Sequence, residues 1–295
     1  MSPKHLFELI VLAAIWGASF IFMRISAPEF GATNLATLRI VIAGLTLSPL
    51  FYLIGKPYLR SHPNKLKVLG KITLVGIGNS VLPFILFAYA AINIDAGLAS
   101  IINATTPLWG AIFSIVILSN RLNNSGWLGL ALGFVGVTVL SQHKLTGELN
   151  SEVLSILAVV TATCLYGLST NFSKRYLQGV PPLLIASGTM FTSAILMAPL
   201  LTLSKVDLMS VSQNSWIAVV VLGVFCTGVA YILFYRLIEN VGPVKAMTVT
   251  YLIPIFGVLF GSVFLSEQFY VNMLFGGVLI LFGVMLTSGL LNKRQ

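Results

Sequence analysis

The stretch TVTYLIPIFGVLFGSVFLSEQ, residues 248–268, decides the fold of this chain. It is apolar for long enough to cross the hydrocarbon core of a membrane, which takes roughly 20 helical residues, and it carries a proline near its middle. An earlier stretch, INATTPLWGAIFSIVILSNR at residues 102–121, follows the same plan of proline, apolar run and polar end. Two such stretches in one chain indicate membrane helices built from an internal repeat.

The composition of the whole chain agrees with this interpretation. Of the 295 residues, 57% are hydrophobic and only 8% are charged, whereas a soluble domain carries about 25% charged residues. The surface therefore cannot be covered by polar groups, and the lipid bilayer is the expected partner. The apolar runs predict an all-α integral membrane protein with ten transmembrane helices, at 6–25, 33–54, 68–91, 96–118, 125–141, 153–173, 181–203, 215–236, 244–265 and 270–291.

The net charge of +9 is distributed by side of the membrane. If the N-terminus is cytoplasmic, most Lys and Arg residues fall on the cytoplasmic side, many of them in the loop at 55–67. This positive-inside asymmetry predicts that both termini are cytoplasmic. The positive charge is thus an orientation signal, and nucleic acid is not an expected partner.

The two halves of the chain match each other at a fixed offset. A shift of 150 residues places WGASFIFMR, from Trp16, over YGLSTNFSK, from Tyr166, and a shift of 147 residues aligns the later spans. We therefore divide the chain into two five-helix repeats, at 1–142 and 143–295. The later matches pair prolines, glycines and serines: Pro107 with Pro254, Gly110 with Gly257, Ser119 with Ser266, Gly129 with Gly276 and Gly136 with Gly283.

An odd number of spans in each half makes the second repeat enter the membrane the other way up. Inverted repeats are a common plan of secondary transporters, which alternate access to a site near the midplane. Pro107 and Pro254 fit this plan, because each removes an intrahelical hydrogen bond at membrane depth. We expect both prolines to mark helix bends beside the cavity; a plain packing kink is the alternative for either one.

These residues resemble a known family. WGASFIFMR in the first span, YRLIENVGPVKAMTVTYLIPIFGVLFGSVFLSE at 235–267 and the glycine-rich fifth and tenth spans are similar to the EamA branch of the drug/metabolite transporter superfamily. The resemblance covers essentially the whole chain. It implies a ten-helix carrier of the inner (plasma) membrane, usually an exporter of small metabolites such as amino acids.

The chain departs from the family pattern at two places. The fourth span ends on Asn120 where the ninth ends on Glu267. Small multidrug-resistance relatives also carry a proton-coupling glutamate where this chain has Ala14, with Cys164 in the second half. The resemblance therefore does not extend to proton coupling by that route, and Glu8 is the remaining acid on the first helix.

Arg39 is the first candidate for the substrate site, because an ionisable group inside a span is expensive in lipid. A guanidinium is well shaped to hold a carboxylate, although a structural arginine that binds backbone carbonyls is the alternative. Solute sites also need a few placed polar groups in an apolar wall. The remaining substrate-binding candidates are therefore polar or aromatic residues of the spans: Trp16, Asn79, Tyr89, Asn103, Tyr166, Asn171, Tyr231, Thr250 and Tyr251.

The fifth and tenth spans are rich in glycine and poor in polar groups, so we expect them to pack on each other away from the substrate. Gly129 and Gly133 form a G-x-x-x-G face, which permits close helix approach; a monomer is expected, with a dimer as the alternative.

No span carries a catalytic set, and His5, His62 and His143 lie at the terminus or in loops. The sequence thus predicts a transporter of a small molecule without enzymatic activity, metal or cofactor. A channel or receptor-like membrane protein is the alternative function.

Overall fold

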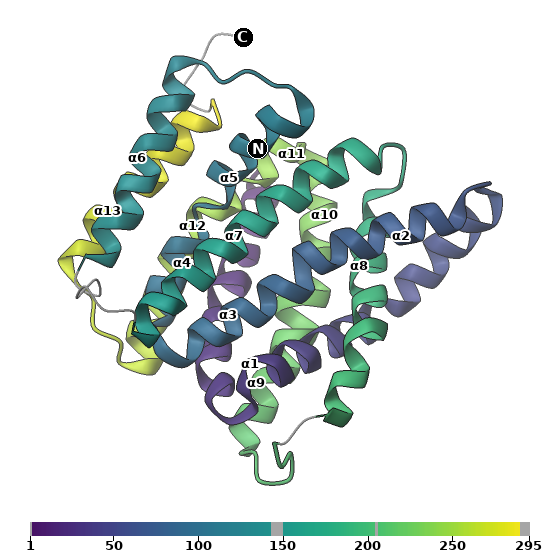
Figure 1. Cartoon of the computed structure of the whole chain (residues 1–295), viewed down its shortest axis with the longest axis horizontal. Helices are drawn as coiled ribbons and strands as arrows, with labels where there is room; N and C mark the ends of the chain where they lie inside the picture. Colours follow the sequence, from purple (N-terminus) through teal and green to yellow (C-terminus); the bar gives the residue numbers. More distant parts are fainter. Residues whose placement is uncertain (1, 143–149, 204–205, 290–295) are drawn as a thin grey trace.

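The computed structural model describes residues 2–142, 150–203 and 206–289, and the regular structure within them is helical throughout. Seven helical runs are long and apolar enough to span a membrane, and two shorter apolar helices complete the set (Figure 1). The chain is therefore a multi-pass membrane protein. In chain order the helices are α1 (Pro3–Ser61), α2 (Lys65–Gly76), η1 (Ile77–Val81), α3 (Leu82–Asn93), α4 (Ala96–Asn103), α5 (Thr106–Leu118), α6 (Asn124–Ser141), α7 (Ser151–Tyr176), α8 (Pro182–Met197), η2 (Ala198–Leu203), α9 (Gln213–Gly223), η3 (Val224–Val229), α10 (Ala230–Val241), α11 (Pro243–Ala246), α12 (Val249–Leu265) and α13 (Val271–Thr287).

Helix α1 contains the first two predicted spans, at 6–25 and 33–54. A sharp bend at Gly31 separates them, because its φ of 71° and ψ of 161° are not helical. Only glycine adopts such angles without strain. The connection expected between the two spans is therefore a single-residue bend rather than a loop.

Several other spans are interrupted along their length. η1 joins α2 to α3, and η3 joins α9 to α10, and both are π-helical turns. The span at 96–118 is broken between α4 and α5, at Ala104 and Thr105. Wide π turns inside α-helices frequently occur at functional sites, because they turn backbone and side chains out of the regular helical pattern.

Short polar loops fix the ends of the helices. The side chains of Asn123 and Asn150 each accept a hydrogen bond of 2.9 Å from the backbone N–H three residues ahead, at the starts of α6 and α7. This is the preferred N-cap arrangement. Helices α5 and α12 both end on a serine in the left-handed conformation, Ser119 with φ 56° and Ser266 with φ 54°.

Helices α6 and α13 pack against each other through glycines, side by side at one edge of the molecule (Figure 1). A Cβ atom on Gly129 would lie 2.5 Å from the carbonyl oxygen of Gly283, and one on Gly136 would lie 2.8 Å from that of Gly276. The glycine faces are thus used for packing within the chain, as expected from the sequence.

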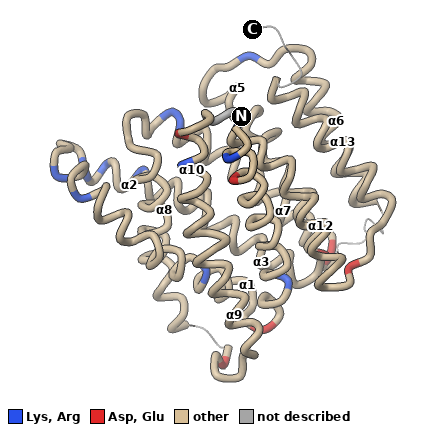
Figure 2. Tube along the Cα trace, turned by 180° about the vertical axis from the view of Figure 1, so that it is seen from behind, with Lys and Arg blue, Asp and Glu red and all other residues tan. Residues whose placement is uncertain are grey.

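The surface of the helix bundle is apolar around its waist and charged at its ends. Large hydrophobic side chains such as Val116, Leu45 and Phe264 are 74%, 68% and 67% exposed, which suits a lipid-facing surface. Lys and Arg gather at the end of the molecule that carries the N-terminus and the end of α13, and most Asp and Glu lie toward the opposite end (Figure 2).

Candidate functional site

A cavity of about 550 Å³ lies among the helices. Its lining comes from both halves of α1, from α7, α8, α10 and α12, and from the interrupted segments around η1, η3 and the α4–α5 break. Neither α6 nor α13 contributes to it. The volume is within the range of small-molecule sites, roughly 300 to 1,000 Å³.

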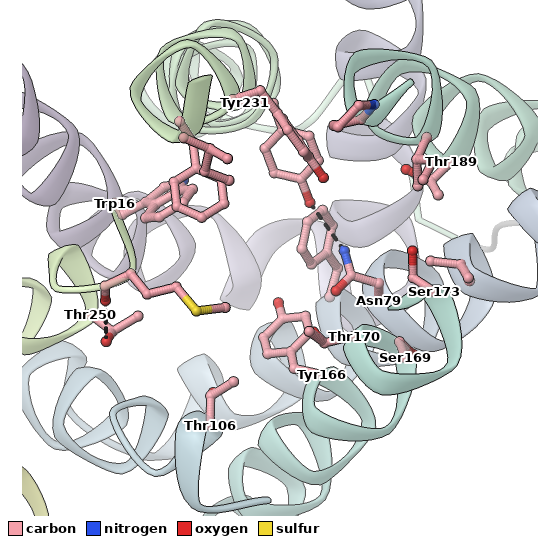
Figure 3. A pocket seen from close by; sticks show the side chains of 18 of the residues that line it. Trp16, Asn79, Thr106, Tyr166, Ser169, Thr170, Ser173, Thr189, Tyr231 and Thr250 are labelled. Carbon is pink, nitrogen blue, oxygen red and sulfur yellow. Dashed lines mark hydrogen bonds between the residues drawn. The ribbon is translucent and has the colours of Figure 1, made fainter. Parts of the chain in front are cut away.

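Aromatic side chains form much of the cavity wall. The ring of Trp16 lies 5.1 Å from that of Phe234, and the ring of Phe87 lies 6.0 Å from that of Tyr166. Figure 3 shows Trp16, Tyr166 and Tyr231 on different sides of the open space. Such walls offer broad apolar contact, and the tyrosines add hydroxyl groups that can orient a solute.

The two π turns place polar atoms at the cavity wall. Asn79 comes from η1, and its Nδ2 atom donates a hydrogen bond of 3.5 Å to the hydroxyl of Tyr231 on α10 (Figure 3). Cys226 comes from η3 and also lines the cavity.

Arg39 is buried at the cavity wall, with 7% of its surface exposed. Its Nε atom donates to Thr227 Oγ1 at 3.0 Å, its Nη1 atom donates to Met23 Sδ at 3.4 Å, and its guanidinium carbon lies 3.8 Å from the centre of the Phe84 ring. All of these partners are neutral. The guanidinium is thus held in place by α1, η3 and α3 while its charge stays unbalanced by them.

The cavity lining includes exposed residues near Lys174, and we call this end of the cavity the open end. There its lining includes the exposed Lys174 and Gln178 and the half-exposed Met247. Lys and Arg gather at this same end of the molecule (Figure 2). At the other extreme of the cavity, Phe20 and Phe87 are 5% and 4% exposed and close it off.

The opposite end of the molecule, which we call the closed end, is tied together by charged side chains. Arg24 Nη1 donates to the carbonyl oxygens of Ala91 and Ile92, at the end of α3. The Glu267 carboxylate accepts from the N–H groups that begin α4, with 2.7 Å to Ala96 N. Partial burial raises the pKa of the Glu267 carboxyl, and these N–H groups act against that rise.

A second carboxylate holds α9 at the closed end. Glu29, beside the α1 bend, accepts hydrogen bonds from Ser212 N at 2.6 Å, from Ser212 Oγ at 2.7 Å and from Ser215 Oγ at 2.8 Å. Negative charge at a helix N-terminus is stabilised by the unpaired N–H groups there. Glu29 and Glu267 therefore hold the starts of α9 and α4 in equivalent ways.

The structure brings most of the sequence-predicted site residues together. The following residues line the cavity: Trp16, Arg39, Asn79, Asn103, Tyr166, Tyr231 and Thr250. They come from helices far apart in the chain, which the fold brings together around one space. Figure 3 labels five of them: Trp16, Asn79, Tyr166, Tyr231 and Thr250.

Three predicted residues lie elsewhere. Asn171 Nδ2 donates to the carbonyl oxygens of Gly110 and Gly167, so its amide joins α7 to α5. The Tyr251 hydroxyl lies 3.0 Å from Ser288 Oγ, beyond α13. Tyr89 is half-buried on α3 and is not part of the cavity lining.

The two prolines differ in their surroundings. Pro107 lies in the first turn of α5, directly after the α4–α5 break, whereas Pro254 lies inside α12. A helix tolerates proline in its first turn without losing a hydrogen bond. The residue four positions before each proline, Asn103 or Thr250, lines the cavity, and the carbonyl of Asn103 accepts a hydrogen bond of 2.8 Å from Thr106 Oγ1.

Several residues that line the cavity were not predicted from the sequence. They include apolar residues that no single-residue rule selects, such as Phe20, Met23, Phe84 and Phe87. The repeat could have found Phe84, because its equivalent, Tyr231, was a predicted candidate. The equivalents of Phe20, Met23 and Phe87 are Thr170, Ser173 and Phe234, which also line the cavity but were not predicted.

The chain is similar to known transporters over most of its length. A model of the EamA-like transporter family matches residues 5–142 and 153–289. An uncharacterized transporter of Archaeoglobus fulgidus is 25% identical over 281 residues, covering 95% of this chain and 97% of that protein. The uncharacterized inner membrane transporter YedA of Escherichia coli is also 25% identical, covering 95% and 90%.

Two further matches concern a named activity and a fold. A probable amino-acid metabolite efflux pump of Salmonella typhimurium is 22% identical, covering 96% of this chain and 94% of that protein. A crystal structure of a protein whose description states no function aligns over 100% of both chains with a TM-score of 0.65 and 18% identity. The latter likeness concerns the fold alone.

Proposed function

Because the chain belongs to the EamA-like transporter family, we propose that it is a secondary transporter that carries small metabolites through this cavity by alternating access. Its two halves, 1–142 and 143–295, act in this proposal as inverted five-helix repeats. When the α1 bend and the two shorter helices are counted, the described residues contain ten helical segments, which supports this division.

The observation that carries the proposal is the symmetry of the cavity wall. Residues equivalent by the 150- or 147-residue shift face the same cavity from the two halves, so the cavity lies where an axis relating the halves would pass. Two-thirds of the lining forms such pairs: Trp16 with Tyr166, Ser19 with Ser169, Phe20 with Thr170, Met23 with Ser173, Arg39 with Thr189, Asn79 with Cys226, Phe84 with Tyr231, Phe87 with Phe234, Asn103 with Thr250 and Thr106 with Ile253.

The close crossings between helices also occur at positions that are equivalent in the two halves. A Cβ on Gly17 would lie 2.5 Å from Phe256 Cβ, and a Cβ on its equivalent, Gly167, would lie 2.7 Å from Trp109 Cβ. Trp109 and Phe256 are themselves equivalent by the 147-residue shift. The π turns η1 and η3 also begin 147 residues apart, at Ile77 and Val224. Equivalent backbone irregularities give each half the same places to bend.

The lining outside the pairs supports an inward-facing state. Apart from Val75, these residues all belong to the second half, and they surround the open end near Lys174 and Gln178. Lys and Arg gather there (Figure 2), and the positive-inside rule assigns such an end to the cytoplasm. In this proposal both termini are cytoplasmic and the membrane is the inner membrane, as in the name of the Escherichia coli relative.

Amino acids and related metabolites are the first substrates to test, because one relative is named as a probable amino-acid metabolite efflux pump. Purified protein in liposomes should show saturable uptake and counterflow of at least one metabolite in a panel. Trp16→Ala and Tyr166→Ala should both reduce that flux about tenfold, whereas Tyr89→Ala, outside the cavity, should leave it unchanged. Flux that rises linearly with concentration and shows no counterflow would instead support a channel.

We further propose exchange or uniport rather than strict proton antiport. Ala14 occupies the position of the coupling acid, and Glu8 is engaged by Arg236, with 2.8 Å between Glu8 Oε1 and Arg236 Nη2. Solute flux should therefore occur without a matching proton flux. Substrate-dependent proton flux that disappears in Glu8→Gln would contradict this part of the proposal.

A further inference from the structure

Arg39 is a buried cation without an anionic partner among the described residues. Its contacts are the hydroxyl of Thr227, the sulfur of Met23 and the face of the Phe84 ring. An arginine side chain keeps its charge inside proteins, and a buried charge without a partner is strongly unfavourable. The site is therefore short of one negative charge.

The cavity wall does not supply that charge, since its lining contains no Asp or Glu. The nearest carboxylates along the same helix are engaged elsewhere. Glu8 pairs with Arg236, and Glu29 accepts hydrogen bonds from Ser212 and Ser215. The only other ionised group in the lining is Lys174 at the open end, which is also a cation. An anion that enters the cavity is thus attracted along its whole depth.

The second half of the chain builds the equivalent part of the cavity wall without a charged residue. The equivalent position in the second half is Thr189, which is 2% exposed and lines the same cavity without any charge. Thr189 donates only to the carbonyl oxygen of Ala186 within its own helix. The two halves therefore share this position in the wall but not its charge, so the charge of Arg39 has a role other than building the shared scaffold.

We propose that Arg39 binds the carboxylate of a monoanionic solute whose apolar or aromatic body lies between Trp16, Tyr166 and Tyr231. This inference rests on the proposed function, and it names the substrate class of the same cavity. The guanidinium still has Nη2, for which no partner is found among the described residues, available for the carboxylate. No acid in the lining receives an ammonium group, so an α-amino group is tolerated and not required.

A ligand series on the unmodified protein tests this directly. Isothermal titration calorimetry would compare 3-phenylpropionate, phenylalanine, 3-phenylpropionamide and phenethylamine, with hexanoate as an aliphatic carboxylate. Because a hydrogen bond to a charged group contributes more than a neutral one, the aromatic carboxylates should bind about 10- to 100-fold more tightly than the amide or the amine. Equal binding of amide and carboxylate would overturn the inference.

Variants separate charge from structure. Arg39→Gln should weaken 3-phenylpropionate about 10- to 100-fold and leave 3-phenylpropionamide unchanged, while Arg39→Lys should restore part of the difference. Arg60→Gln, at the exposed end of α1, is the matched control and should bind like the unmodified protein. An equal loss for both ligands in Arg39→Gln would assign the arginine to structure alone.

The outcomes also distinguish this inference from the proposed function. If neutral or cationic solutes show saturable counterflow and no carboxylate in the series binds, the transporter proposal stands and the inference about Arg39 is wrong. If carboxylates bind through Arg39 but no solute shows counterflow, the binding site stands and the transport proposal fails.

Discussion

The Glu267 carboxylate accepts a hydrogen bond from the backbone N–H of Ala96, with 2.7 Å between Oε1 and N. The end of α12, in the second half, thereby caps the start of α4, in the first. The equivalent position to Ala96 in the second half is Pro243, which has no N–H to donate. The first half ends its fourth span on Asn120, without an acid, at the position equivalent to Glu267.

Removing this cap should weaken the closed end. Loss of an N-cap acceptor costs about 0.5 to 2 kcal/mol, so Glu267→Ala should lower the melting temperature in detergent, and Glu267→Gln should lower it less because an acceptor oxygen remains. Glu239→Ala, on the exposed surface of α10, is the control. A melting temperature unchanged in Glu267→Ala would show that the cap contributes nothing to the closed end.

The same carboxyl should make opening of the closed end sensitive to pH. Burial raises the pKa of Glu267 in the closed arrangement, and water restores the ordinary value once the end opens. The closed arrangement then binds the proton more tightly, so acidification toward the ordinary carboxyl range favours it and rising pH favours opening. Ala96 is 3% exposed in the closed arrangement. The rate at which a thiol reagent labels Ala96→Cys, corrected for the thiolate fraction, should therefore rise with pH and lose this dependence in Glu267→Gln.

Two glycines at the crossing of α5 and α7, Gly110 and Gly167, should differ in their tolerance of a methyl group. A Cβ on Gly167 would lie 2.7 Å from Gly110 N, whereas a Cβ on Gly110 would have no atom within 4 Å. Gly167→Ala should be overpacked by about 1 to 3 kcal/mol. Gly110→Ala should be neutral or gain about 0.5 to 1 kcal/mol from helix propensity. Thermal unfolding of the two variants measures the difference, and equal stabilities would contradict the close approach of α5 and α7.

Arg24 and Lys174 occupy equivalent positions and should act at opposite ends. Arg24 bonds to the carbonyl oxygens of Ala91 and Ile92, and the equivalents of those residues are Ile238 and Glu239. We expect Lys174 to bond to these carbonyls when the open end closes. Arg24→Ala should therefore favour the outward-facing state, and Lys174→Ala the inward-facing state, each by about tenfold.

Labelling of Gln178→Cys at the open end measures this balance, in a background with Cys164→Ser and Cys226→Ser. The Arg24→Ala variant should label more slowly and the Lys174→Ala variant at least as fast as the parent. A shift in the same direction for both would contradict the exchange of roles.

Because their surroundings differ, Pro107 and Pro254 should respond differently to substitution by alanine. Pro254 lies inside α12 and leaves the carbonyl of Thr250 without its intrahelical N–H, whereas Pro107 lies in the first turn of α5. Pro254→Ala should stabilise α12, by up to about 3 kcal/mol, and slow counterflow because the helix becomes stiffer. Pro107→Ala should change both much less. Wild-type counterflow in Pro254→Ala would make that proline a packing kink.

The sequence predicts the membrane spans well because their signal is length and apolarity, which are counted over many residues. It does not predict how the spans are interrupted. The bend at Gly31, the break at Ala104 and Thr105 and the π turns depend on how neighbouring helices satisfy the backbone, and such contacts are absent from a local pattern.

The cavity residues show a second limit. Thr250 and Tyr251 are adjacent and both polar, yet only Thr250 lines the cavity, while Tyr251 reaches Ser288. Successive residues of a helix point about 100° apart, and in a span that is apolar on every face no polar stripe reveals which direction is inward. The internal repeat carries more information, because a lining residue in one half identifies its equivalent in the other.

In the proposed transport cycle the open and closed ends exchange, and two equivalent pairs of spin labels report on both ends at once. Gln178 and Glu239 flank the open end, and their equivalents, Pro28 and Ile92, flank the closed end; all four are exposed. Double electron–electron resonance in lipid nanodiscs would follow both pairs with and without a solute that supports counterflow. Solute should populate a state with a shorter Gln178–Glu239 distance and a longer Pro28–Ile92 distance, whereas two unchanged distances, or two that change in the same direction, would contradict alternating access.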